Sequence, residues 1–219
     1  VAGGVLVSSK LWRGWESWRG KSSLERAAIR SLLAAKRLLV EQVPGGELVS
    51  VYVRGSFTRR DMVPGSDVDI AVILASKRRL KLVERLLARF NTRSQVQIGF
   101  CVFTLWELRT GREVKGKRKK LSVASMVDDL DHAKLLYGTD VSSWKLRRPS
   151  HVELLKGELR FMRSFYRCVA DDSCWRRLLK RSFYIVFREQ LLLGRRPPRA
   201  RTALPSFVSG RNHIIHDIV

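Results

Sequence analysis

The first clear pattern in this chain is a helical period of apolar residues over positions 23–42. The apolar positions return every three or four residues, at Ala28, Leu32, Ala35 and Leu39. Ser22 and Glu25 have capping-box spacing at the start of this predicted helix. Upstream, three aromatic residues recur every third position, and we expect them to pack against a core rather than stack on bases; they are Trp12, Trp15 and Trp18.

A period of two replaces the helical period after the glycines that follow position 44. Valines alternate with other residues over 48–53, which predicts a strand. Residues 68–74 are nearly all apolar, so a second strand there would be buried on both faces. A basic amphipathic helix over 78–90 and a third strand over 95–103 follow. The expected order is helix, strand, strand, helix, strand, with a loop at 55–66 that is rich in Arg, Gly and Pro.

The second half of the chain has mainly helical patterns. Residues 109–120 are dominated by Lys, Arg and Gly and predict an exposed loop. Helices are expected over 122–137, where Gly138 would end the helix, and over 152–169 and 174–193. A Pro- and Arg-rich linker and a short segment over 205–219 complete the chain. We therefore expect an α+β domain over 1–146 and a helical domain over 147–219.

Charge distinguishes this chain from an ordinary globular protein, because 43 Lys and Arg against 20 Asp and Glu give a net charge of +23. Such a field attracts polyanions, so RNA or another polyanion is an expected partner. The basic run from Arg112 to Lys120 is the best local site for it, although such runs are usually solvated loops. No apolar run approaches the roughly 20 residues of a membrane span, and the three cysteines lack metal-ligand spacing. We expect a cytoplasmic protein without membrane association.

Two carboxylates at the start of the second predicted strand are the strongest chemical signal. Asp67 and Asp69 are two positions apart, so both side chains should lie on one face of the strand, where a divalent cation would relieve their repulsion. Oxygen ligands favour Mg²⁺ or Mn²⁺. Upstream, Gly55 and Ser56 follow a strand, and a glycine turn lets backbone N–H groups approach a phosphate. An Asp-x-Asp pair by itself also occurs in ordinary turns. The interpretation therefore rests on the combination of this pair with the buried strand and with the Gly55–Ser56 turn upstream.

The stretch from Gly55 to Ile70 resembles the signature of the DNA polymerase β superfamily of nucleotidyltransferases, especially its small minimal members. Gly-Ser, a basic loop, Ser-Asp-x-Asp and an apolar strand stand in the family's order. The resemblance implies a mixed sheet flanked by helices and a following helical bundle. It implies that Asp67 and Asp69 are catalytic and bind two metal ions, Mg²⁺ or Mn²⁺. It assigns contacts with a nucleoside triphosphate to Gly55 and Ser56. We expect ATP to be that nucleotide, and we expect Arg59, whose charge suits phosphate oxygens, and Ser66 to assist.

One position departs from that family's pattern. The family usually has a third carboxylate on the next strand, and we place Gln97 at the corresponding position. An amide can coordinate through its oxygen, but it carries no charge and is not a base. Either catalysis is weakened, or another acid substitutes, or the protein only binds nucleotide. The candidate substitutes are Asp128, Asp129 and Asp131. Glu107 is a weaker candidate.

The C-terminal segment carries a second, separate resemblance. Arg211, Asn212 and His216 resemble the Arg-x₄-His motif of HEPN domains, many of which are metal-independent ribonucleases that partner minimal nucleotidyltransferases. In that family the Arg stabilises phosphate and the His acts as acid or base. Shared family lineage, without ribonuclease activity, also explains the motif.

Together these patterns predict a metal-dependent enzyme that transfers a nucleoside monophosphate from a nucleoside triphosphate and releases pyrophosphate. The acceptor would be RNA, which the charge favours, or a hydroxyl on a partner protein, which the resemblance favours. The alternatives are a nucleotide- or RNA-binding protein weakened by loss of the third carboxylate, and a HEPN-like ribonuclease that uses Arg211 and His216.

Overall fold

The computed structural model describes residues 11–114, 121–165, 172–198, 203–208 and 213. The chain forms two compact units, residues 1–148 and 149–219, and each is described by itself. The division falls two residues beyond the boundary expected from the sequence.

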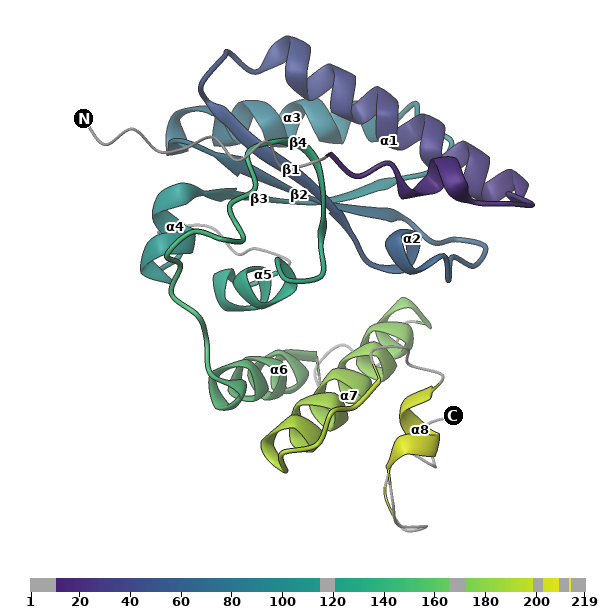
Figure 1. Ribbon diagram of the computed structural model, residues 1–219, viewed down its shortest axis with the longest axis vertical. Coiled ribbons are helices and arrows are strands. Elements are labelled where there is room, and N and C mark those ends of the chain that lie inside the picture. The colour runs from purple at the N-terminus through teal and green to yellow at the C-terminus, as the bar shows by residue number, and fades with distance from the viewer. Residues whose placement is uncertain (1–10, 115–120, 166–171, 199–202, 209–212, 214–219) are drawn as a thin grey trace. The chain divides into compact units, whose positions relative to one another are not determined.

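The N-terminal unit is built on a four-stranded mixed sheet (Figure 1). Strand β1 pairs with β2 and β4 in antiparallel fashion, while β2 and β3 are parallel, which gives the order β3-β2-β1-β4. The strands are β1 (Leu48–Arg54), β2 (Val68–Leu74), β3 (Ile98–Thr104) and β4 (Lys134–Gly138). The first three strands and the helices between them follow the predicted order.

Helices cover both faces of this sheet (Figure 1). On one face lie α1 (Ser23–Gln42) and α3 (Leu80–Asn91), the latter preceded by the 3₁₀ turn η2 (Lys77–Arg79). On the other face lie α4 (Leu105–Thr110) and α5 (Val123–Asp129). The sheet residues alternate between the two cores, so that Ile70, Val72 and Leu74 face α1 and α3, whereas Ala71 and Ile73 face α4 and α5.

Two local predictions about the start of the unit are confirmed. The Ser22 hydroxyl accepts from the Glu25 N–H, and the Glu25 carboxylate accepts from the Ser22 N–H, which is the expected capping box. The tryptophans pack against one another and against Phe57, with ring centroids 5.1 to 6.5 Å apart. Trp15 lies within the short 3₁₀ helix η1 (Gly14–Ser17) and is buried, and Trp12 and Trp18 lie on either side of that helix in the chain. Aromatic packing therefore braces the segment that follows β1.

The helix expected over 122–137 is wrong in its second half. Helix α5 ends at Asp129, and residues 134–138 form β4 along the edge of β1. Leu135 enters the core beneath α4 and α5, while Leu136 enters the core beneath α1 and α3. A short apolar run buried on both faces of a sheet cannot be distinguished from a buried helix by periodicity alone.

The C-terminal unit is helical, as expected. Its elements are α6 (His151–Phe165), α7 (Asp172–Leu192) and α8 (Leu204–Phe207). Nη1 of Arg181 on α7 donates to both carboxylate oxygens of Glu158 on α6, at 2.7 and 3.0 Å, and this ion pair links the two helices. Among the described residues, no helix combines the length and the apolarity needed to cross a membrane.

Candidate active site

Asp67, Asp69 and Gly99 meet at one end of the sheet. A methyl group placed on Gly99 would lie 2.5 Å from Oδ2 of Asp67 and 2.8 Å from Oδ1 of Asp69. Both carboxylates therefore border a single point in space, as the alternation of side chains along a strand predicts. Asp69 shares its side of β2 with Ala71, so the carboxylates lie on the face covered by α4 and α5. Asp67 is exposed and Asp69 is half-buried.

Gly55 brings the end of β1 against the same carboxylates. Its φ of +78° lies in the region that favours glycine, and a methyl group there would be 2.9 Å from Oδ2 of Asp69. In the β1–β2 register, Arg54 stands opposite Asp69. The glycine turn predicted from the sequence thus lies beside the carboxylate pair, and its backbone has no side chain that would block a ligand.

The remaining predicted nucleotide ligands follow in the loop between β1 and β2. Ser56 begins the short helix α2 (Ser56–Arg59) and is half-buried. Arg59 lies at the end of α2, where its Nε is 3.0 Å from Oδ2 of Asp61. The Ser66 hydroxyl accepts from the Val63 N–H at 2.9 Å, which shapes the turn just before Asp67.

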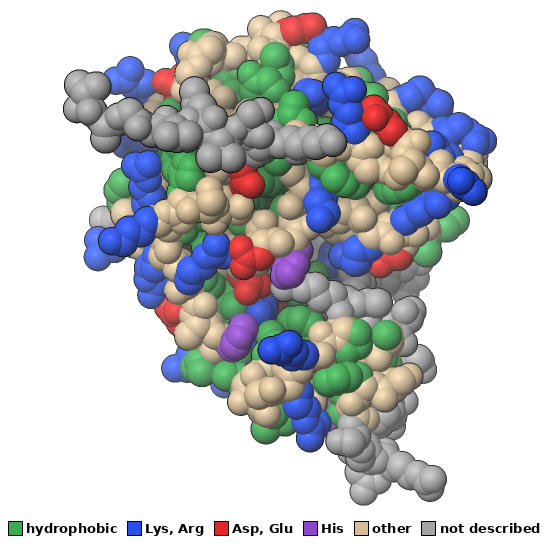
Figure 2. Space-filling view, in the orientation of Figure 1, with side chains coloured by type: hydrophobic (Ala, Val, Ile, Leu, Met, Phe, Trp, Pro, Cys, Tyr) green, Lys and Arg blue, Asp and Glu red, His purple; other side chains and the backbone are tan. Residues whose placement is uncertain are grey.

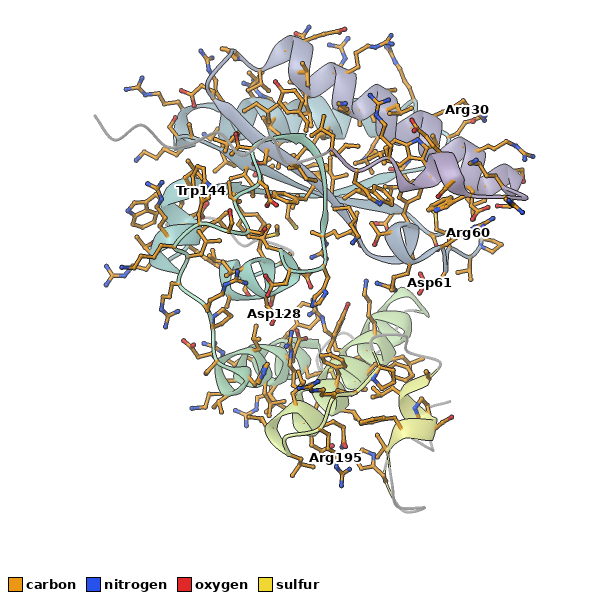
Figure 3. All side chains as sticks on the ribbon, in the orientation of Figure 1. Arg30, Arg60, Asp61, Asp128, Trp144 and Arg195 are labelled. Atoms are coloured by element: carbon orange, nitrogen blue, oxygen red, sulfur yellow. The ribbon has the colours of Figure 1, made fainter. Side chains whose placement is uncertain are left out.

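Arg60 has a different role from its neighbour. Its Nε donates to Oε1 of Glu25 at 2.7 Å, its Nη2 donates to the Arg19 carbonyl at 2.6 Å, and its guanidinium lies 5.4 Å from the Trp18 ring (Figure 3). These contacts also lower the pKa of the Glu25 carboxyl, chiefly through the hydrogen bond from Arg60. Arg60 anchors the loop to the start of α1, and it accepts a left-handed backbone, φ +60°, to do so.

The third-carboxylate position is where the structure differs most from the sequence expectation. Strand β3 begins at Ile98, and the parallel register places Gly99 opposite Asp69. Gln97 lies before the strand and is exposed, and its Nε2 donates to the backbone carbonyl of Asn91 at 3.0 Å. The residue that borders the carboxylate pair on β3 is therefore Gly99, which has no side chain.

Three of the suggested substitute acids have partners of their own within the described residues. Asp129 forms an ion pair with Arg54, and Oδ1 of Asp131 lies 2.8 Å from Nη1 of Arg148. Glu107 is fully buried and caps α4 through the Thr104 N–H. Asp128, on α5, is half-buried (Figure 3). Within the described ranges, no group of three or more His, Cys, Asp and Glu side chains could hold a metal ion.

The donor set still fits a divalent cation that arrives with phosphate. Mg²⁺ keeps several waters and is commonly bound through one or two carboxylates together with phosphate oxygens of the substrate. Asp67 and Asp69 supply such a pair, and the glycines at 55 and 99 leave room beside it. A site with two carboxylates would bind a bare metal ion weakly and a metal–triphosphate complex better.

Sequence reasoning missed Gly99 and the Arg54–Asp129 pair. The signal for Gly99 was available only through strand pairing, since Gly99 is the β3 residue opposite Asp69 in the register. Arg211 and His216 of the second motif lie outside the described residues. The neighbouring His213 is described, and its Nε2 is 2.9 Å from Oε2 of Glu189.

The mixed four-stranded sheet with helices on both faces is consistent with an α+β nucleotidyltransferase fold. Residues 35–123, which include both carboxylates and the Gly55 turn, match the family model of the nucleotidyltransferase domain. No curated protein matches the chain.

The solved structures similar to this chain include an adenyltransferase and a putative nucleotidyltransferase. Spectinomycin adenyltransferase AAD(9) from Enterococcus faecialis, solved with ATP and spectinomycin, has a TM-score of 0.54 at 13% identity, over 87% of this chain and 96% of that one. That likeness supports the fold. A putative nucleotidyltransferase from Sulfolobus solfataricus is 25% identical over 48% of this chain and 93% of its own, with a TM-score of 0.31.

Proposed function

We propose that this protein transfers a nucleoside monophosphate from a nucleoside triphosphate to an acceptor and releases pyrophosphate. The observation that carries the proposal is the convergence of Asp67, Asp69 and the Gly55 turn at one end of the sheet. The match of residues 35–123 to a nucleotidyltransferase domain agrees with it. ATP is the favoured substrate, because the similar spectinomycin adenyltransferase was solved with ATP.

In this proposal, Asp67 and Asp69 hold Mg²⁺ or Mn²⁺ together with the triphosphate. The cation, when bound, neutralises charge on the phosphates and on the leaving pyrophosphate. Gly55 and Ser56 position the triphosphate, and Arg59 and Ser66 assist. An acceptor oxygen forms a bond to the α-phosphorus, the bond from that phosphorus to the bridging oxygen breaks, and pyrophosphate departs with the electron pair.

The acceptor hydroxyl must give up its proton as its oxygen bonds to the α-phosphorus, and this step calls for a base. Gly99 occupies the β3 position beside the carboxylate pair, so β3 offers no base there. This observation favours a second candidate function, a nucleotide-binding protein that does not transfer. RNA remains the proposed acceptor, supported by the net charge of +23. Figure 2 shows Lys and Arg side chains spread across this face of the N-terminal unit rather than gathered into one patch.

Labelled nucleotides separate the two candidates. The purified full chain is incubated with Mg²⁺, RNA and ATP labelled at the α- or the γ-phosphate. Transfer predicts α-label in RNA and γ-label in pyrophosphate, and both signals should disappear with EDTA and in Asp69→Asn. Glu41→Gln, the same chemical change on the exposed side of α1, should keep both signals. Thermal stabilisation by Mg·ATP without release of labelled pyrophosphate would reject transfer in favour of binding.

The ribonuclease alternative is tested in the same samples. A HEPN-like enzyme needs no metal, so it would shorten RNA in the presence of EDTA, and Arg211→Ala or His216→Ala would stop this. Intact RNA under EDTA would remove that alternative.

A further inference from the structure

A groove of about 590 Å³ runs between α1 and α3, on the face of the sheet opposite Asp69. Four apolar side chains form much of its lining: Ala34, Leu38, Leu86 and Phe90. Ala34 is exposed and the other three are half-buried, so none of them is fully covered by the protein itself. None of the residues that line the groove belongs to the candidate active site.

The groove runs along two nearly continuous stripes of residues. On α1 its lining residues recur every four positions, at 30, 34, 38 and 42. On α3 they lie at 86, 89 and 90, and residues 93–95 of the segment that follows α3 continue the lining. Each stripe lies beside the face that its helix buries against the sheet, which for α1 contains Ala28, Leu32 and Leu39. Two neighbouring helices with such stripes form a trough into which the apolar face of a third helix packs.

Arginines are the charged residues of this groove. Arg30, Arg89 and Arg93 line it, and the described lining residues include no carboxylate. Nη2 of Arg30 donates to Oε1 of Gln95, a neutral group, at 3.1 Å (Figure 3). None of the three arginines forms an ion pair with a carboxylate in the described part of the chain. An occupant that places acidic groups beside these arginines would therefore gain charge-assisted hydrogen bonds without displacing an existing pair.

We propose that the groove between α1 and α3 binds an amphipathic helix of a partner protein, one whose apolar stripe is flanked by Asp and Glu. The apolar lining requires an apolar face on the ligand, and the arginines require negative charge beside it. A nucleic-acid strand meets the second requirement but not the first. Its phosphates would lie over aliphatic side chains, and Phe90 is the one aromatic ring among the described lining residues for base stacking.

A displayed peptide library tests this directly. Its 16-residue helices carry leucines fixed at helical spacing and random residues at the flanking positions, and the bait is the full chain. We expect helices with Asp and Glu beside the leucines to be enriched. Arg89→Glu combined with Arg93→Glu should remove that enrichment, whereas Arg78→Glu combined with Arg79→Glu, an equal charge change on η2, should preserve it.

The binding of one enriched peptide, followed by fluorescence anisotropy, completes the test. Replacing Arg89 and Arg93 by Gln should weaken it by about tenfold or more, the scale of one lost charge-assisted contact. Ala34→Arg, at an exposed helical position, should block it while the melting temperature is retained. The proposal is overturned if no acidic helix is enriched, or if enrichment survives the charge reversal. It is equally overturned if oligouridylate binds at these arginines and displaces the peptide at a lower concentration than a soluble acidic peptide without leucines.

Discussion

Gly99 on β3 and Asp67 ahead of β2 are so close that a single methyl group on the glycine would lie 2.5 Å from Oδ2 of the aspartate. The same methyl would lie 2.8 Å from Oδ1 of Asp69. The atoms it would meet are carboxylate oxygens at the ends of side chains rather than backbone atoms, so the side chains rather than the backbone would move. A side chain at position 99 would therefore change the geometry of the carboxylate pair more than the stability of the fold.

Gly99→Ala should impair nucleotide binding while the protein stays folded. Displaced carboxylates should weaken Mg·ATP binding by about 10- to 100-fold, the range seen when groups that orient metal ligands are disturbed. Isothermal titration measures the affinity and thermal melting checks the fold. Gly45→Ala is the matched control, because a methyl there would meet nothing within 4 Å. Equal affinities of the two variants for Mg·ATP would contradict the prediction, because they would show that binding does not depend on the positions of Asp67 and Asp69 beside Gly99.

Arg54 and Asp129 should prove to be a structural pair. Their side chains are 18% and 32% exposed, so removing either partner leaves a charge only partly hydrated. Arg54→Met and Asp129→Asn should each lower the free energy of unfolding by about 1–3 kcal/mol, with a coupling energy of about 1–2 kcal/mol in the double variant. Urea unfolding gives these values. If Asp129→Asn instead leaves stability unchanged and abolishes transfer, Asp129 is the missing third acid.

The contact between Glu25 and Arg60 predicts a specific dependence on pH. The hydrogen bond from Arg60 lowers the pKa of Glu25, so the stabilisation is complete above the carboxyl's ordinary pKa of about 4.3 and is lost as the pH falls through the lower folded value. Glu25→Gln keeps the capping-box geometry without the charge. It should be less stable than wild type by about 1–2 kcal/mol at pH 7, and the gap should close in strong acid.

Chemical unfolding at a series of pH values measures that gap. Glu41→Gln, on the exposed side of α1, should show no such trend. A constant difference between Glu25→Gln and wild type from pH 7 down to pH 3 would contradict the assigned role of the charge.

Tyr52 should stabilise the connection between β4 and the end of the unit through its hydroxyl. The hydroxyl donates to Oδ1 of Asp140 at 2.9 Å and accepts from the buried Val141 N–H at 2.7 Å, and burial raises the pKa of Tyr52 above its usual range. Tyr52→Phe would leave that N–H without a partner and should cost about 1–3 kcal/mol. Denaturant unfolding measures the loss. Tyr137→Phe, whose hydroxyl makes no hydrogen bond within the described part of the chain, should cost less.

Much of the N-terminal unit could be read from residue patterns, because those patterns are local. The capping box at Ser22, the alternation in β1 and the apolar run of β2 depend only on near neighbours in the chain. The position of Asp67 beside Asp69 follows from the period of a strand. The packing of the tryptophans followed from their spacing, although their partner Phe57 did not.

The features that could not be predicted depend on pairing between distant segments. The resemblance places Gln97 at the third-carboxylate position, but only the parallel register with β2 shows that Gly99 is the β3 residue opposite Asp69. Strand β4 was mistaken for the end of a helix, because its apolar residues serve two cores and so lack the alternation of an ordinary edge strand. Neither the strand register nor the second hydrophobic core can be predicted from the sequence pattern of a single segment.

The fourth strand has a practical consequence for anyone dissecting this protein. The family match ends at residue 123, yet β1 pairs along its far side with residues 134–138, and the backbone N–H of Trp12 donates to the Leu135 carbonyl at 2.7 Å. A fragment trimmed to the matched boundaries would lose this strand, the aromatic brace and half of α1. Without β4, the edge of β1 would be exposed and could pair with strands of other molecules. Such a fragment should therefore aggregate on expression, whereas a fragment spanning residues 11–148 should remain in solution.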